Sequence, residues 1–162
     1  MTEQCIIALG SNLSEPDKQL HQAFDALGQL TNCRLLRCSS LYSSHPLGPQ
    51  DQDRFVNAAA LLETALSPVQ LLLALQSIEH RFGRVKTRHW GERIIDLDII
   101  FYGRHLVDIK HPSLTIPHPE ALNRDFVLVP VLEICPDWKL PNGTALKDQL
   151  ANADNFDLHK IN

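Results

Sequence analysis

The run of residues 94–102, Ile-Ile-Asp-Leu-Asp-Ile-Ile-Phe-Tyr, constrains the fold more than any other part of the chain. It is rich in β-branched and aromatic side chains and is closed by Gly103, which predicts a buried strand. Two aspartates interrupt it, although Asp is depleted in strands and an unpaired buried carboxylate is costly. Because successive side chains of a strand point to opposite faces, Asp96 and Asp98 share one face, roughly 6–7 Å apart. The other face, directed toward a core, carries Ile95, Leu97 and Ile99.

The two carboxylates indicate a magnesium site. Mg²⁺ is a hard cation that proteins hold through one or two carboxylates together with oxygens of a phosphate substrate. The alternative is that Asp96 and Asp98 pair with Arg84, Arg88 or Arg93 in a purely structural network. The poor fit of Asp to a strand interior favours the metal site, although a bare Asp-x-Asp motif has low specificity.

The length and composition of the chain are those of one ordinary domain. We expect residues 1–162 to form it, with a peripheral tail after about residue 150. The net charge of −4 gives no overall attraction to nucleic acid or to an anionic membrane, so any anion site must be local. The basic residues between positions 81 and 93 are the candidate. No apolar run is long enough to span a bilayer and no basic leader is present, so we expect a cytoplasmic protein.

The cysteine pattern predicts neither a disulfide framework nor a zinc site. No two cysteines form a Cys-x-x-Cys motif, and no histidine cluster completes a zinc-binding spacing. We expect reduced thiols in or near the core. The four cysteines are Cys5, Cys33, Cys38 and Cys135.

The first elements are a strand and a helix. Residues 5–9 are apolar and predict a buried strand, which Gly10 ends. A glycine there serves either a tight turn or the close approach of a ligand. Ser14 is a candidate N-cap for the next helix, with Pro16 in its first turn and Gly28 at its end. The apolar face of this helix, with i, i+3, i+4, i+7 spacing, consists of Leu20, Ala23, Phe24 and Leu27.

Two further strands and a loop follow. Residues 33–43 predict a strand, and residues 44–53, with two prolines and a glycine, predict a long loop that is either functional or simply solvated. Residues 54–64 have good helix propensity, but we interpret them as a strand with Phe55 and Asn57 on one face. Asn57 among apolar neighbours needs partners, either the edge of a ligand or the adjacent loop.

A second helix starts at residues 67–68, where a cap residue precedes a first-turn proline. Gln76 and Glu79 lie within it, and we interpret both as ordinary polar-face residues. The basic loop of residues 84–89 either grips a polyphosphate or is a solvated surface segment. Its position next to Trp90 and the aspartate strand favours the first interpretation.

The chain after the aspartate strand has a weaker pattern. Residues 106–109 predict a brief edge strand, and prolines on both sides of His118 hold that histidine in a stiff backbone. A lone histidine is more often structural than catalytic. The run 127–134 is β-branched but contains Pro130, and we interpret it as a helix with proline in its first turns. A short helix over residues 146–150 follows, and the polar residues beyond it are expected to fray.

Five stretches, in the right order, resemble the signature of the 6-hydroxymethyl-7,8-dihydropterin pyrophosphokinases. The likeness runs from Ile6 to about Asp148 and is strongest in the stretch that contains the two aspartates. Five matches in register are hard to obtain by chance. The stretches are residues 8–13, 46–57, 79–84, 89–102 and 115–126.

The resemblance implies a ferredoxin-like α+β sandwich, in which helices pack on an antiparallel sheet. The strand-helix-strand-strand-helix-strand order up to Tyr102 agrees with that fold. It also implies transfer of a diphosphate from ATP to the hydroxymethyl group of the pterin, with AMP as the other product. ATP would be the co-substrate, with two Mg²⁺ ions. The partners would be these small molecules, with no nucleic acid or membrane, and the protein would be a monomer.

The resemblance assigns a role to each matching residue. Asp96 and Asp98 would hold the metal ions while Arg84 and Arg93 grip the β- and γ-phosphates, which makes these four the catalytic candidates. Trp90 would close over both substrates. The remaining ATP-site residues would be Gln76, Lys86, Arg88, Ile99, Thr115, His118 and Arg124. The pterin pocket would consist of the stacking pair Phe55 and Phe126 with Gly10, Ser44, Pro46, Leu47, Asn57 and Trp90.

One stretch departs from the family pattern. Residues 89–94 are His-Trp-Gly-Glu-Arg-Ile, where Arg-Trp-Gly-Pro-Arg-Thr is common. A permanent cation thereby becomes the titratable His89, and Glu92 adds a negative charge. We hypothesise that Arg88, one residue upstream, supplies the missing cation. An Arg88→Ala variant with unchanged turnover and ATP affinity would contradict this hypothesis.

Two other classes of function compete with this interpretation. A ferredoxin-like regulatory module that binds a ligand without chemistry would leave Asp96 and Asp98 without a role. A Mg²⁺-dependent phosphatase, nuclease or other phosphotransferase would use both aspartates, but the acidic net charge argues against nucleic acid. Mg²⁺-dependent binding of a non-hydrolysable ATP analogue separates the classes, because a regulatory module needs no metal and a nuclease gains nothing from a pterin.

Overall fold

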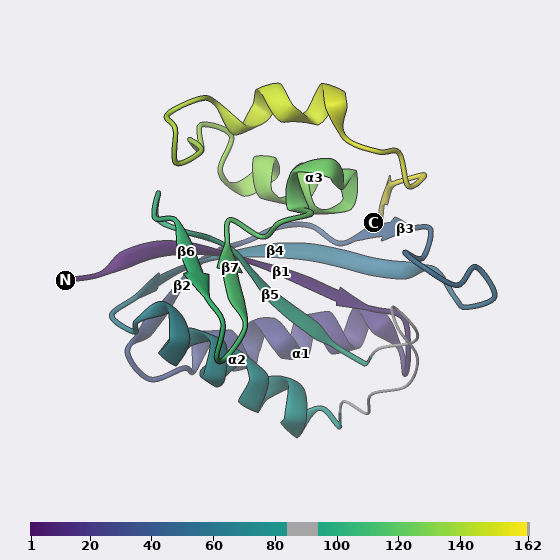
Figure 1. The fold of residues 1–162 in the computed structure, drawn as a ribbon. Coiled ribbons are helices and arrows are strands. Elements are labelled where there is room, and N and C mark those ends of the chain that lie inside the picture. The colour runs from purple at the N-terminus through teal and green to yellow at the C-terminus, as the bar shows by residue number, and fades with distance from the viewer. Residues whose placement is uncertain (84–93, 162) are drawn as a thin grey trace.

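The protein is built in three layers (Figure 1). The structure, a computed structural model, describes residues 1–83 and 94–161. Helices α1 (Pro16–Gly28) and α2 (Pro68–Arg81) cover one face of the central sheet, and α3 (Asp125–Ile134) covers the other. Pro130 lies inside α3, as the sequence predicted.

The sheet is antiparallel and confirms the predicted α+β sandwich. Its central strands are β1 (Glu3–Ser11) and β4 (Phe55–Thr64), which pair from Glu3 opposite Thr64 to Ser11 opposite Val56. β5 (Asp96–Tyr102) pairs with the free edge of β1. β2 (Cys33–Cys38) pairs with the second half of β4, and β3 (Tyr42–Ser44) pairs with its first residues. The ambiguous segment around Asn57 is therefore a strand.

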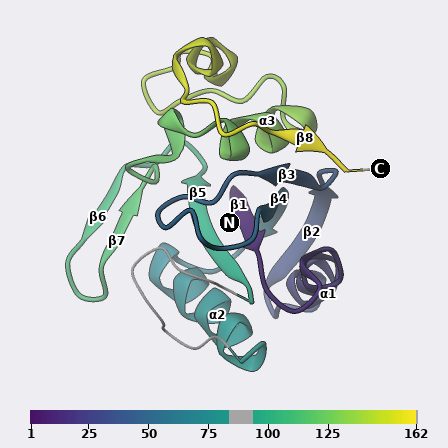
Figure 2. The same ribbon diagram turned by 90° about the vertical axis from the view of Figure 1, so that its right-hand side faces the viewer.

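Smaller elements complete the chain. β6 (Val107–Ile109) and β7 (Leu114–Ile116) form a separate ribbon beside the sheet, and 3₁₀ turns η1 (Ala121–Asn123) and η2 (Leu146–Asn152) flank α3. The prediction that the polar tail frays is wrong. Its last strand, β8 (His159–Lys160), pairs with β3 and lies beside it, below α3 (Figure 2).

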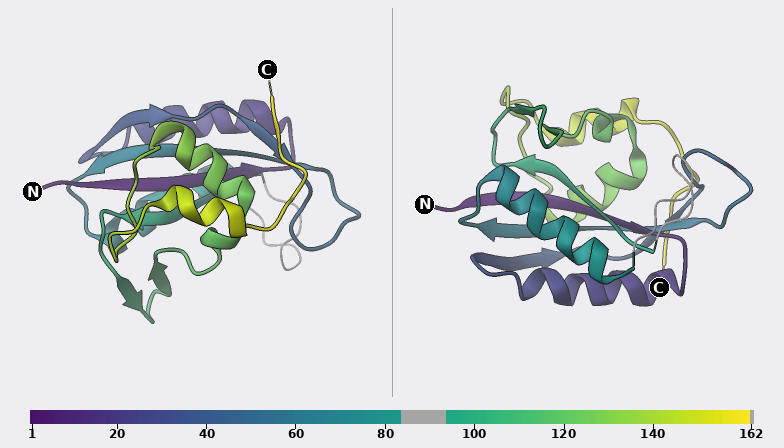
Figure 3. Two further views of the ribbon diagram at one scale, coloured as in Figure 1. Left: turned by 90° about the horizontal axis from the view of Figure 1, so that it is seen from above. Right: turned by 60° about the horizontal axis from the view of Figure 1, so that its bottom comes forward.

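Strand alternation divides the apolar residues between two cores. One lies between the sheet and helices α1 and α2, which both cover the lower face (Figure 3, right), and it contains Leu97 and Ile99. The other lies under α3 and η2 (Figure 3, left) and contains Ile6 and Phe101. The register between β1 and β5 shifts between Ile6 and Ile7, and Ile100 lies in the upper core together with Phe101. The predicted face of α1 is buried in the lower core: Leu20, Ala23, Phe24 and Leu27.

The two long helices begin differently. α2 has the predicted cap, because the Ser67 side chain accepts a hydrogen bond from the Gln70 backbone N–H at 3.2 Å and the Gln70 side chain reciprocates. The prediction that Ser14 caps α1 is wrong. Glu15 occupies the N-cap in a left-handed conformation with φ of 59° and makes no side-chain cap. Ser14 precedes it with φ of 54°, so the chain enters this helix through two strained residues.

Two strand predictions also need correction. β1 does not end at Gly10 but continues through Ser11, so a tight turn is not the reason for the glycine. The predicted strand over residues 33–43 is two strands, interrupted around Ser39. There the Ser39 N–H donates to the Ala59 carbonyl at 2.9 Å and the Ala59 N–H donates to Ser39 Oγ at 2.8 Å. The Ser39 side chain thus replaces one hydrogen bond of the β-ladder. No glycine or proline within residues 33–43 marks this break.

A carboxylate ties α3 to the edge of the sheet. Glu133 accepts hydrogen bonds from the Tyr42 hydroxyl at 2.5 Å and from the backbone N–H and the hydroxyl of Ser40. Partial burial acts to raise the pKa of Glu133, but the hydrogen bonds from Tyr42 and Ser40 outweigh it, so the pKa lies below its ordinary value. Burial, with the same carboxylate, raises the pKa of the Tyr42 phenol.

All four cysteines are free, as predicted. Burial raises the pKa of the Cys5 thiol to about 12, and burial also raises the pKa of Cys135 despite nearby Arg37. Cys38 is exposed, so its predicted place in or near the core is wrong. It lies at the end of an outer strand, where one side chain in two faces solvent.

Candidate active site

One cavity of about 270 Å³ opens on the α3 side of the sheet. It lies at the end of the sheet where β1 and β3 finish and where β4 and β5 start. Four strand ends and the first turn of α3 therefore meet around it. The predicted site residues that line it are Gly10, Ser44, Leu47, Phe55, Asn57, Asp96, Asp98, His118, Arg124 and Phe126.

The two aspartates form one wall of the cavity. Asp96 and Asp98 stand opposite Gly10 and Ala8 in the register with β1, and both line the cavity while Leu97 between them is buried in the lower core. Asp96 is half-buried and Asp98 is exposed. Hard carboxylate oxygens open to a cavity suit a Mg²⁺ ion that shares its coordination with a substrate. Within residues 1–83 and 94–161, no group of three His, Cys, Asp or Glu could hold a metal by itself.

A buried glutamate supports this wall from below. Glu79 of α2 is 5% exposed, and its Oε2 accepts a hydrogen bond of 2.8 Å from the Leu97 backbone N–H. The interpretation of Glu79 as an ordinary polar-face residue is therefore wrong. The sequence held a signal for its burial, since Glu79 lies four residues after Leu75 on the apolar stripe of the helix. It anchors the backbone between the two aspartates.

Two phenylalanines bring aromatic surface to the cavity. Phe55 is the first residue of β4 and Phe126 the second of α3, and both are half-buried. The guanidinium carbon of Arg124 lies 5.7 Å from the centroid of the Phe126 ring, within the range of a cation–π contact. The aromatic pair and the carboxylates thus open into one space.

Asn57 is fixed so that its carbonyl faces this space. It is 5% exposed, and its Nδ2 donates to Ser44 Oγ at 2.8 Å and to the Tyr42 carbonyl at 3.4 Å. Those bonds direct the amide nitrogen toward β3. Its Oδ1 lies on the side of Gly10, 3.7 Å from where a Cβ on that glycine would stand. The amide therefore ties down the adjacent strand and leaves its carbonyl oxygen on the side of Gly10.

His118 and Arg124 line the cavity near the aspartates. Burial is the main reason why the pKa of His118 lies below its ordinary value; Asp98 opposes this shift and Arg124 adds to it. The Glu120 backbone N–H donates to His118 Nδ1 at 3.3 Å, so the neutral ring carries its hydrogen on Nε2. Arg124 also pairs with the carboxylate of Glu120.

Four predicted site residues do not line this cavity. Gln76 is exposed on α2, Thr115 is exposed on β7, and Pro46 is buried beside the cavity lining. The Ile99 side chain is in the lower core, because it is on the opposite face from the aspartates. The predicted residues that lie outside the described part of the chain are Arg84, Lys86, Arg88, Trp90 and Arg93.

Some lining residues were missed by the sequence analysis. Ile100 continues the alternation of Asp96 and Asp98, which was a usable signal. His45 and Glu120 carry no such signal, because their neighbourhood depends on how distant loops meet. The other missed lining residues are Ala8, Leu9 and Val127.

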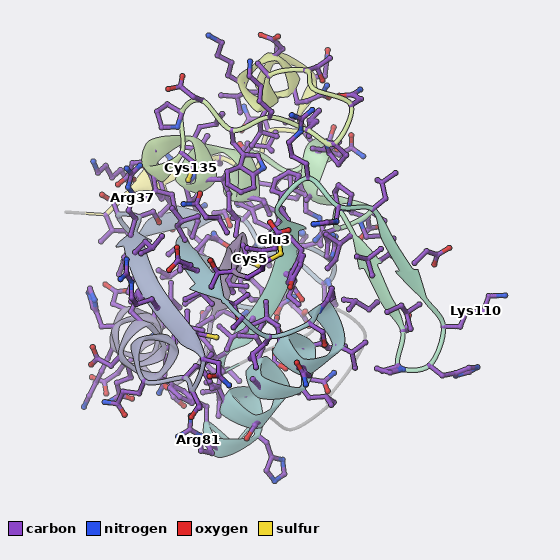
Figure 4. All side chains as sticks on the ribbon, turned by 90° about the vertical axis from the view of Figure 1, so that its left-hand side faces the viewer. Glu3, Cys5, Arg37, Arg81, Lys110 and Cys135 are labelled. Atoms are coloured by element: carbon purple, nitrogen blue, oxygen red, sulfur yellow. The ribbon has the colours of Figure 1, made fainter. Side chains whose placement is uncertain are left out.

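A second groove, of about 1100 Å³, lies at the other end of the sheet, where β1 begins and β4 ends. Figure 4 looks onto this end of the molecule and labels Glu3, Arg37 and Cys135 around the groove. Two of its charged groups bind the protein itself: Glu3 contacts His105, and Arg37 donates to the Ile134 carbonyl at 2.6 Å. We assign it no ligand.

A cavity that combines a carboxylate pair with aromatic rings and a hydrogen-bonding amide suits an enzyme that moves a phosphate-containing group onto a flat heterocycle. Comparison with known proteins agrees with this class. The model of the 7,8-dihydro-6-hydroxymethylpterin-pyrophosphokinase (HPPK) family matches residues 6–136. The chain belongs to this family.

Individual relatives support the same conclusion. The chain is 49% identical to the 2-amino-4-hydroxy-6-hydroxymethyldihydropteridine pyrophosphokinase of Haemophilus influenzae over 156 residues, which cover 96% of both chains. It is 48% identical to the enzyme of that name from Pseudomonas aeruginosa, with coverage of 93% and 92%. The HPPK-DHPS of Plasmodium falciparum with pterin and p-hydroxybenzoate matches in fold, with a TM-score of 0.74, 14% identity, and coverage of 93% of this chain and 43% of that one.

Proposed function

We propose that this chain transfers a diphosphate from ATP to the hydroxymethyl group of 6-hydroxymethyl-7,8-dihydropterin, a step in folate biosynthesis, and releases AMP. One observation carries the proposal: Asp96 and Asp98 open into the same cavity as Phe55 and Phe126. A phosphate-binding wall and a heterocycle-binding wall then face one reaction space. The family membership of the chain gives the identity of the two substrates.

The metal proposal concerns the aspartate wall. Asp96 and Asp98 would hold two Mg²⁺ ions, which when bound neutralise charge on the ATP phosphates. The chain contributes a rigid platform for this, because β5 is a strand and Glu79 fixes the backbone of Leu97 between the carboxylates. Transfer of a phosphate-containing group depends on positioning and charge stabilisation more than on a strong base. We assign no general base to the described residues.

The pterin proposal concerns the aromatic wall. A flat ring between Phe55 and Phe126 gains about 0.5–1.5 kcal/mol per aromatic contact beyond its area burial. The Asn57 Oδ1 accepts a hydrogen bond from an N–H at the ring edge, and its orientation is set before binding by Ser44. Arg124 and His118 line the same cavity and would contact the phosphates.

The coarser features follow the same proposal. We propose a single domain that acts as a cytoplasmic monomer on these small molecules. In the part of the chain that the structure describes, no helix has the length and apolar character needed to cross a membrane.

The test mixes the protein with ATP, Mg²⁺ and 6-hydroxymethyl-7,8-dihydropterin and follows AMP by chromatography. We expect AMP only when the pterin is present, and we expect Asp98→Asn to reduce turnover at least about 100-fold, the scale of losing one major electrostatic contact to the transition state. Asp25→Asn, a matched change on the exposed face of α1, is the control and should keep full turnover.

Two results would contradict the proposal. ADP in place of AMP would mean a different kinase. A folded protein that turns over no nucleotide in the presence of all three reactants would favour a binding module without chemistry.

A further inference from the structure

The C-terminal tail reaches back to the proposed pterin site. Residues 154–161, here the tail strap, run from the start of α3 to the edge of the sheet at β3 (Figure 2). Their path is fixed at the near end by the Asp154 N–H, which donates to the Asn123 carbonyl at 2.8 Å. At the far end β8 pairs with β3, and the Ile161 N–H donates to the Leu41 carbonyl at 2.8 Å. The strap therefore spans two parts of the molecule that are far apart in sequence.

Its first set of contacts holds Phe126. The Phe156 ring meets the Phe126 ring edge-on, with centroids 4.9 Å apart and an interplanar angle of 89°. The Phe156 backbone N–H donates to Asp125 Oδ2 at 3.2 Å, which fixes the strap to the residue before Phe126. Phe156 is not among the cavity-lining residues, so it supports the ring of Phe126 without facing the cavity.

Its second set of contacts holds the other side of the cavity. The Phe156 carbonyl accepts from the His45 N–H at 2.8 Å. Arg54 donates to the Asp157 carbonyl at 2.6 Å and to Asp157 Oδ2 at 3.2 Å. Arg54 immediately precedes Phe55 and His45 immediately follows Ser44, so these bonds fix the backbone that carries the cavity lining.

We infer that the tail strap sets the spacing of the two aromatic rings that bind the pterin, with Phe156 as the positioning residue on the Phe126 side and the Arg54–Asp157 contact as its counterpart on the Phe55 side. This inference rests on the proposed function, because it assigns the two rings to the pterin. Phe55 is the first residue of β4 and Phe126 the second of α3, so both rings lie where their elements begin. The strap connects those two starts directly, through the Phe156 ring on one side and Asp157 on the other.

The test measures the dissociation constant of 6-hydroxymethylpterin by its fluorescence, at saturating Mg²⁺ and non-hydrolysable ATP analogue. We expect Phe156→Ala to raise this constant about 3- to 10-fold, the loss of one aromatic support. Phe156→Tyr keeps the ring contact and should restore nearly all of the affinity. The affinity for the ATP analogue should stay the same in both variants. Arg54→Met, a change at a partly exposed side chain, should weaken pterin binding to a similar extent without loss of folding.

Two controls separate positioning from general destabilisation. Trp138→Ala removes another aromatic pair of the α3 layer, with Phe101 at 5.7 Å, at the far end of the sheet. It should lower the melting temperature but leave pterin affinity unchanged. In a Phe126→Ala background, Phe156→Ala should have no further effect on pterin affinity, because the ring that it supports is gone.

The outcomes for the strap and for the proposed function are distinguishable. Pterin-dependent AMP from the unmodified protein, with unchanged pterin affinity in both Phe156→Ala and Arg54→Met, overturns the strap and leaves the function in place. An effect of Trp138→Ala as large as that of Phe156→Ala also overturns it. Absence of pterin-dependent AMP from the unmodified protein overturns the function, and with it the strap.

Discussion

Gly10 offers a sharp test of where the pterin lies. It lies inside β1 and pairs with Asn57 in the register with β4. A Cβ added there would stand 3.7 Å from Asn57 Oδ1, 3.8 Å from Phe55 Cδ1 and 3.9 Å from the Val56 carbonyl oxygen, all ordinary van der Waals distances. The substitution Gly10→Ala therefore fits the folded protein. In a strand interior it should leave stability unchanged or raise it by up to about 1 kcal/mol.

The same methyl group would block the ligand. It projects between the amide and the ring that we propose to hold the pterin, into space that is open in the present cavity. Forcing one extra methyl group into a fitted contact costs about 1–3 kcal/mol. That cost corresponds to a rise of about 5- to 150-fold in the pterin dissociation constant. The affinity for an ATP analogue should not change, because the three heavy atoms nearest to the new Cβ belong to Asn57, Phe55 and Val56 and not to the aspartates.

The assay combines thermal unfolding with pterin fluorescence at saturating Mg²⁺ and ATP analogue. Gly28→Ala is the matched control, because its new Cβ would meet only Leu35 Cδ2 at 3.8 Å and Leu35 Cβ at 3.9 Å, at the end of α1. It should alter neither property beyond the effect of an ordinary glycine replacement. A Gly10→Ala protein that folds normally and binds the pterin as tightly as the unmodified chain would refute the placement of the ring against Phe55 and Asn57.

Two further predictions concern the support of the site and of α3. Glu79→Ala should lower the free energy of unfolding by about 1–3 kcal/mol in a urea titration, because the Leu97 N–H loses its acceptor in a buried environment; an unchanged midpoint would mean that this bond is dispensable. Tyr42→Phe should destabilise the protein at neutral pH and less so in acid. The folded-state pKa of Glu133 lies below its unfolded value, so its stabilising effect is complete above the unfolded pKa and is lost as the pH falls through the folded pKa. A destabilisation by Tyr42→Phe that is equal at pH 7 and pH 3 would contradict this account.

The parts of the fold that could be predicted are those fixed by local alternation. The sidedness of β5 followed from its sequence, since Asp96 and Asp98 share a face whatever lies across from them, and Leu97 must then point the other way. The apolar stripe of α1 was equally visible. The same alternation puts the Ile99 side chain in the core and not in the cavity.

Other features depend on which distant segments meet, so a local pattern gives at most part of them. The break between β2 and β3 has no glycine or proline; it arises because Ser39 bonds with Ala59 across the sheet. The Glu79 side chain lies on the apolar stripe of α2, but its burial is tolerable only because the Leu97 N–H comes to it from another element.

The tail shows why polar composition is a poor guide to disorder near a site. Residues 154–161 bury little apolar surface, and their sequence alone favours a frayed end. Their order comes from backbone bonds to Asn123, His45 and Leu41, which any residue type can make and which composition therefore does not reveal. Their aromatic contact is between Phe156 and the ring of Phe126, and the Asp157 carboxylate adds an ion pair with Arg54. The strap is held mainly by its backbone, and its one aromatic contact is with a ring of the cavity wall. The geometry of the site therefore explains the order of this segment better than the stability of the core does.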